Sequence, residues 1–97
     1  MGNTVFNIVL NIKSGQDFQT FGKFFLGNNR NFAESIFQKL KGDKKISRKS
    51  IICLELHETR QELPLNVQIL ACTLDELAEN CKMITREVFK QFNLEQR

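Results

Sequence analysis

The sequence predicts an α+β domain: a two-layer sandwich in which a three-stranded, mainly antiparallel sheet is covered on one face by three helices, in the order β-α-α-β-β-α. Three observations lead to this fold class. Residues 4–13 alternate like a strand, residues 16–26 carry phenylalanines at helical spacing, and residues 74–92 form a long amphipathic pattern behind a helix-capping motif. The chain has 97 residues, which is the length of one domain, so we expect a single domain over residues 1–97.

The first strand is expected at residues 4–13. Phe6, Ile8 and Leu10 recur at every second position, which predicts one strand face turned to the core. Ser14 and Gly15 then interrupt the alternation.

Two short helices are expected next, at residues 16–26 and 30–41. The apolar residues of the first follow the i, i+3, i+7 spacing of one helix face: Phe18, Phe21 and Phe25, with Phe24 beside them. Six of the nine phenylalanines fall within residues 18–37, and because Phe has no polar atom we expect most of this cluster in the core. Glycine and asparagine at 27–29 separate the helices, which predicts an antiparallel helical hairpin lying against the sheet.

The second and third strands are expected at residues 50–58 and 64–72, joined by a polar turn. The residues expected to face the helices are Ile52, Leu54 and Leu56 in one strand and Leu65, Val67, Ile69 and Ala71 in the other. Pro64 lacks a backbone donor and therefore predicts the start of an edge-facing strand.

The last helix has the clearest local signal. Thr73, followed by Glu76 three residues later, matches a capping box directly before an apolar helical run. One stripe follows the helix spacing: Leu74, Leu77, Ala78, Cys81, Ile84, Val88, Phe89 and Phe92. This pattern predicts an amphipathic helix of about five turns resting on the core.

The sheet face turned away from the helices is expected to be half apolar. Its apolar residues are Val5, Val9, Ile51, Cys53, Leu70 and Cys72. A solvated sheet face normally shows cleaner polar alternation, so we take these six residues as a candidate homodimer interface. The alternative is that the sheet edges and the chain ends cover them, since scattered surface aliphatics are common.

Positive charge is concentrated in one segment. Residues 39–49 hold six basic residues against one acidic residue, a local net charge of +5 in a chain whose net charge is +3. The candidate anion-binding residues are Lys39, Lys41, Lys44, Lys45, Arg48 and Lys49. They suit the phosphates of a nucleic acid or the surface of an acidic protein, although a charge run of this length is also typical of a solvated loop.

No catalytic or metal-binding set is expected. Cys53, Glu55 and His57 share a strand face, but Cys53 and His57 stand roughly 13 Å apart along a strand, which is too far for a nucleophile and its base. A zinc site would need Cys72 opposite Cys53, which a short turn between the strands disfavours and a longer turn leaves open. We find no glycine-rich phosphate loop and expect no cofactor.

The phenylalanines of residues 16–26 suggest one further possibility. Phe18, Phe21, Phe24 and Phe25 are a candidate lining for a pocket that holds an apolar small molecule, beside their ordinary role as core residues.

The expected function is therefore a small non-enzymatic protein-interaction or adaptor module that forms a homodimer through the open sheet face. The two alternatives are binding of an anionic partner by residues 39–49 and binding of an apolar ligand by the phenylalanine cluster. No segment reaches the ~18 apolar residues of a membrane span, and no secretion signal is recognised. Three cysteines, an odd number, favour reduced thiols, so we expect a cytoplasmic protein with no membrane partner.

Overall fold

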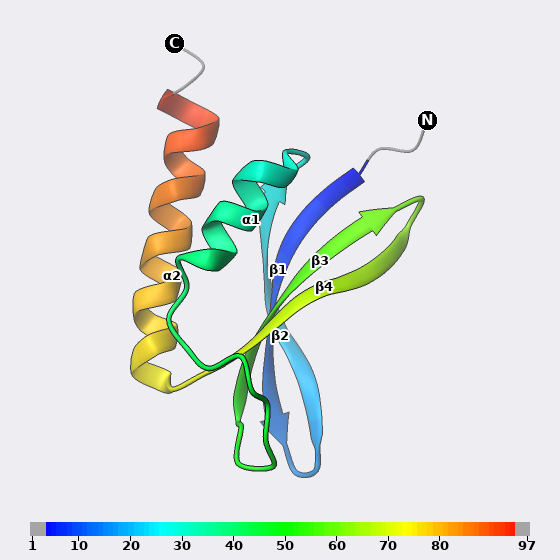
Figure 1. The fold of residues 1–97 in the computed structure, drawn as a ribbon, viewed down its shortest axis with the longest axis vertical. Helices are drawn as coiled ribbons and strands as arrows, with labels where there is room; N and C mark the ends of the chain where they lie inside the picture. Colours follow the sequence, from blue (N-terminus) through cyan, green and yellow to red (C-terminus); the bar gives the residue numbers. More distant parts are fainter. Residues whose placement is uncertain (1–3, 95–97) are drawn as a thin grey trace.

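The computed structural model describes residues 4–94 as two β-hairpins, each followed by a helix (Figure 1). The elements are β1 Thr4–Ser14, β2 Asp17–Gly27, α1 Arg30–Gln38, β3 Ile52–Arg60, β4 Leu63–Cys72 and α2 Leu74–Phe89, continued by a π-helical turn, η1, at Lys90–Leu94. The chain is an α+β protein, as predicted. The predicted three-stranded sheet with three helices is wrong, because the sheet has four strands and the described residues contain two α-helices.

The difference arises at residues 16–26, where strand β2 replaces the first predicted helix. Gly15 and Gln16 form a two-residue turn, and Ser14 pairs with Asp17 across it. Gly15 has a φ of 68°, a value that glycine adopts readily and that tight hairpin turns need. The predicted helical hairpin therefore does not form. Its first half pairs with β1 in a β-hairpin, and only the second predicted helix forms, as α1.

The sheet is antiparallel throughout, with the strand order β2-β1-β3-β4. The two hairpins join along β1 and β3, so β2 and β4 are the edge strands. The segment between α1 and β3 adds a short bridge to the β4 edge, where Asp43 and Ala71 exchange backbone hydrogen bonds of 2.7 and 2.8 Å. Of the two edges, β2 carries no such bridge among residues 4–94.

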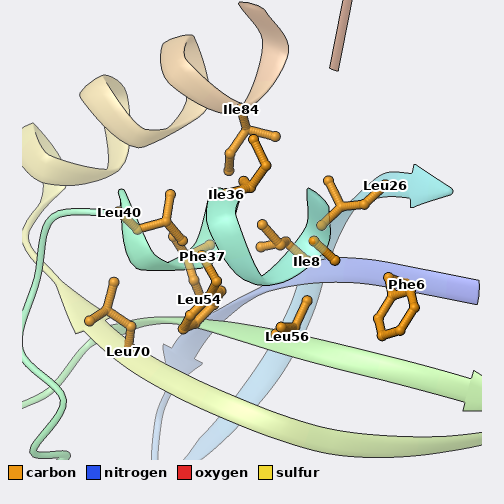
Figure 2. Packing of buried hydrophobic residues seen from close by; sticks show 11 residues of the cluster. Phe6, Ile8, Leu26, Ile36, Phe37, Leu40, Leu54, Leu56, Leu70 and Ile84 are labelled. Atoms are coloured by element: carbon orange, nitrogen blue, oxygen red, sulfur yellow. The ribbon is translucent and has the colours of Figure 1, made fainter. Parts of the chain in front are cut away.

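Both helices lie on one face of the sheet and bury a single apolar cluster (Figure 2). Ile36 of α1 and Ile84 of α2 meet above Ile8 of β1 and Leu54 of β3, and all four are almost completely buried. The burial of side chains of this size contributes about 1.5–3 kcal/mol each to the hydrophobic stabilisation of the fold.

The helix starts follow their capping signals. The Asn29 side chain accepts a hydrogen bond from the Phe32 amide at the start of α1. At the start of α2, the predicted capping box is confirmed: Thr73 Oγ1 accepts from the Glu76 amide, and Glu76 Oε1 accepts from the Thr73 amide. Neither helix of residues 4–94 has the length and the apolar run that a membrane crossing requires.

From Gln68 to Cys72, strand β4 presents the opposite face from the one predicted, whereas Leu65, paired with Glu58, keeps the predicted side. Leu70 pairs with Leu54 and Cys72 with Ile52, and residues paired across two strands share a sheet face. Leu70 is therefore in the core, 4% exposed, and Cys72 packs against it. A bulge at Val67 shifts the register between Leu56 and His57, so strict alternation does not hold along this strand.

Candidate functional site

Helix α2 has two apolar stripes rather than one. Leu77, Ile84 and Val88 face the core together with Asn80, which is also buried. The second stripe faces outward and consists of Leu74, Ala78, Cys81, Thr85 and Phe89. Leu74 and Phe89, at its two ends, are 71% and 58% exposed. The helix is thus apolar around more of its circumference than the core covers.

The outward stripe forms a shallow groove of about 740 Å³, which we call the α2 groove. Its floor is Ala78, Cys81, Thr85 and Phe89, and its rim is Lys82, Arg86 and Lys90. In Figure 1, α2 stands at the margin of the molecule, with α1 and the sheet on its inner side. No described element covers the groove.

The α2 groove continues towards edge strand β2. A second hollow, of about 380 Å³, shares Thr85 and Phe89 with the groove and is completed by Phe24, Phe25 and Lys23 of β2, together with Ile84 and Val88. Phe25 is 57% exposed, and its ring stacks on Phe92 with the centroids 6.1 Å apart. An exposed apolar surface therefore extends from α2 to an unpaired strand edge, which is a common property of interaction sites.

The charges exposed on α2 are separated along its length. Asp75 and Glu79 lie in the first half of the helix, Lys82 and Arg86 lie in the second half, and Lys90 follows at the start of η1. Glu87 accompanies these cations and contacts Lys39, Arg86 and Lys90 at 3.6–3.7 Å. Beside the groove, one half of the helix is therefore acidic and the other basic.

The six residues of the predicted dimer interface lie on different surfaces of the structure. Val5, Val9 and Cys53 lie on the open sheet face, where neighbouring strands already bury Val9 and Cys53. Ile51 is exposed just before β3, whereas Leu70 and Cys72 lie on the helix-covered face. The six residues do not form one surface.

A hydrogen-bonded network crosses the open face instead. Thr20 donates to Asn11 Oδ1 (2.8 Å), Asn11 Nδ2 donates to Glu55 Oε2 (2.9 Å), and Glu55 Oε1 meets His57 Nε2 at 2.7 Å. Every buried side-chain nitrogen and oxygen in residues 4–94 has a partner. A satisfied polar network of this kind ties three strands together and leaves few polar atoms for a ligand.

The cysteines lack the properties of nucleophiles. Burial, and to a smaller extent the Glu55 charge, raises the pKa of Cys53, and burial raises the pKa of Cys81 and brings that of Cys72 to about 11. All three thiols therefore remain protonated at neutral pH. Cys72 faces the helices and Cys53 the open face, so the two do not meet at a zinc site, and the described part of the chain has no group of three residues placed to hold a metal.

The basic segment is exposed but anchored. All six predicted anion-binding residues are exposed: Lys39, Lys41, Lys44, Lys45, Arg48 and Lys49. The backbone of Lys41 is held by Asn80, the backbone of Asp43 by Ala71, and the carbonyl of Arg48 by the Lys13 ammonium. Within residues 4–94, only Lys39 of the six takes part in an ion pair, with Glu87.

The predicted phenylalanine pocket does not form, because its residues lie on a strand. Phe24 packs against the core, whereas Phe18, Phe21 and Phe25 are exposed. Phe21 occupies a bulge opposite β1. Phe24 and Phe25 do line the hollow beside α2, which is an open surface between two elements rather than a pocket inside a helical hairpin.

The sequence reasoning missed the outward role of Ala78 and Thr85 and the inward role of Asn80. The available signal was the width of the apolar stripe on α2, which exceeds what one core contact uses. Comparisons with protein-family models, with curated protein sequences and with solved structures found no match.

Proposed function

We propose that this chain is a small non-enzymatic protein-interaction module whose docking surface is the α2 groove. The observation that carries the proposal is the uncovered outward stripe of α2, in which Leu74 and Phe89 are more exposed than buried. Contiguous exposed apolar surface with a polar rim is typical of protein-binding sites. The proposal moves the docking surface from the open sheet face to α2, since the open face carries a satisfied polar network.

The groove suits an amphipathic helix. Its floor follows helical spacing, and its rim carries Lys82, Arg86 and Lys90. A partner with apolar residues at i, i+3 or i+4 and acidic residues beside them would complement both the floor and the rim.

Peptide-display selection on the folded chain tests this function. Peptides enriched on the wild type should contain apolar residues at helical spacing with flanking acidic residues, and should lose binding to Thr85→Lys, which places a long charged side chain on the groove floor. The matched control is Gln38→Lys, which adds the same charge at an exposed position of α1. Peptides that bind the wild type and Thr85→Lys equally well would place the docking surface elsewhere.

A second candidate function is binding of an anionic polymer or an acidic protein by the segment 39–49. Its support is that hydrogen bonds fix the backbone of the segment at Asp43, Lys45 and Arg48, while the side chains of Lys44, Lys45 and Arg48 are exposed. Retention on heparin should weaken steeply with salt and should fall when these three residues become Gln. The control replaces Lys23, Lys82 and Lys90 with Gln, the same loss of charge at another place. If heparin retains both triple variants equally, binding of an anionic partner by the segment 39–49 is ruled out.

A further inference from the structure

We infer that the partner in the α2 groove is a second copy of this chain, whose α2 lies antiparallel to the first in a two-fold dimer. This inference rests on the proposed function, because it names the occupant of the same surface. Two-fold dimers are the commonest oligomers and bring one surface patch against itself. The surface must therefore complement its own copy in shape and in charge.

The apolar residues of the outward stripe of α2 meet this requirement. A two-fold axis between Cys81 and Lys82 places Leu74 of one copy at the level of Phe89 of the second, and Ala78 at the level of Thr85 of the second. Leu74 and Phe89 are the two most exposed large apolar side chains of α2, and this pairing covers both. The small side chains of Ala78 and Thr85 lie between them, where helix axes about 8 Å apart leave little room.

The charges meet the requirement as well. The same axis places Glu79 within two residues, about 3 Å along the helix, of the level of Lys82 of the second copy. It places Asp75 at the same small offset from Arg86 of the second copy. A parallel arrangement would instead set the acidic half beside the acidic half and the basic half beside the basic half. Charge complementarity therefore selects both the partner and the antiparallel direction.

The position of α2 in the fold permits this contact. The helix stands at the margin of the molecule, and the sheet and α1 lie on its inner side (Figure 1). A second copy can therefore approach the outer side of α2 while the two sheets remain apart.

Charge reversal tests the arrangement, with molar mass from light scattering as the readout. Asp75→Lys with Glu79→Lys makes positions 75, 79, 82 and 86 of α2 all basic, and Lys82→Glu with Arg86→Glu makes these four positions all acidic. Each double variant alone should dimerise at least about tenfold more weakly than the wild type, because like charges then face one another. An equimolar mixture of the two variants should recover a species of twice the chain mass, because each acidic helix then meets a basic one.

Several results would overturn the inference. The charge pairing is wrong if either double variant alone dimerises as the wild type does, or if their mixture stays monomeric. A wild type that stays monomeric at every concentration excludes the second copy. In that case, display peptides that bind the wild type but not Thr85→Lys would still support the proposed function. If no such peptides are found, the proposed function is ruled out as well. Circular dichroism checks that the variants fold. The single substitutions Glu79→Lys and Lys82→Glu, at positions that face each other across the axis, carry the same test with less change to the helix.

Discussion

Asn80 of α2 holds Lys41 through both of the lysine's backbone polar atoms. The Lys41 amide donates to Asn80 Oδ1 at 2.8 Å, and Asn80 Nδ2 donates to the Lys41 carbonyl at 2.9 Å. Asn80 is buried among the core-facing residues of α2, so this pair of bonds fixes the rotation of the helix about its own axis. It thereby turns Ala78 and Thr85 outward, and it anchors the start of the basic segment.

Substitution of Asn80 by Ala should destabilise the fold by about 2–3 kcal/mol, because it removes two hydrogen bonds and leaves the Lys41 amide and carbonyl without their partner. Urea unfolding should show a lower midpoint with an unchanged slope. The control is Asn93→Ala, which removes one exposed bond to the Phe89 carbonyl. Equal stability of the two variants would contradict the anchoring role of Asn80.

Glu58 should make the stability of the protein depend on pH. The residue is 5% exposed, and its carboxylate accepts hydrogen bonds from Arg30, at 2.9 Å, and from Arg60. The hydrogen bond from Arg30 lowers the pKa of Glu58 most, and the hydrogen bond from Arg60 lowers it further by a smaller amount. Together they hold the pKa below its ordinary value, although burial acts to raise it. Because the folded pKa is the lower one, the stabilisation is complete above the ordinary carboxyl range and is lost as the pH falls through the folded value.

Comparison of the wild type with Glu58→Gln checks this relationship. The wild type should have the larger free energy of unfolding at neutral pH, and the difference should shrink as the pH is lowered through the folded pKa of Glu58. Glu62→Gln, in the exposed turn between β3 and β4, serves as the control. A stability difference that stays constant from neutral to acid pH would contradict the role assigned to the two arginines.

The turn between β3 and β4 should accept a stabilising substitution. Gln61 and Glu62 both have positive φ values, 50° and 68°, in a two-residue hairpin turn that favours Asn-Gly. Replacing them with Asn and Gly should raise the free energy of unfolding by about 1 kcal/mol, because the strain of the left-handed backbone is relieved. Glu62→Val should act in the opposite direction, since a β-branched residue rarely adopts this conformation. Thermal unfolding measures both changes.

The three cysteines should react slowly while the protein is folded. Burial raises the pKa of each thiol, that of Cys72 to about 11, so the thiolate fraction at neutral pH is small. Alkylation followed by mass spectrometry should show slow modification of the native chain, slowest at Cys72, and rapid modification of all three in urea. Rapid alkylation of native Cys53 would contradict this prediction. It would indicate a reactive thiol beside Glu55 and His57 and would support a catalytic site on the open sheet face.

The parts of the fold that sequence predicts are those with a local signal. The capping box at Thr73 and Glu76 marks the start of α2, and the apolar alternation of β1 marks its strand. The helix predicted at residues 16–26 is wrong for two reasons. A short apolar run such as Phe18, Phe21 and Phe25 fits a helix or a strand equally well. In addition, the bulges at Phe21 and Leu26 interrupt the two-residue period by which β2 could have been identified as a strand.

The site depends on long-range packing that the pattern does not contain. The bulge at Val67 reverses the expected facing of Leu70, and with it the makeup of the open sheet face. On α2, Asn80 is buried and Thr85 is exposed because the Asn80 side chain hydrogen-bonds to the backbone of Lys41, which is 39 residues away in the sequence. Neither the register of β3 and β4 nor the contact between Asn80 and Lys41 can be predicted from the local spacing of these residues.

The molar mass of the chain in solution, from light scattering over a range of concentrations, tests the central claim most directly. The account predicts that the wild type and Gln38→Lys reach twice the chain mass of 11.3 kDa, whereas Thr85→Lys stays at that mass because its charge lies in the centre of the paired helices. A wild type that remains at 11.3 kDa, or a Thr85→Lys variant that dimerises as readily as the wild type, would contradict the assignment of the α2 groove to a second copy.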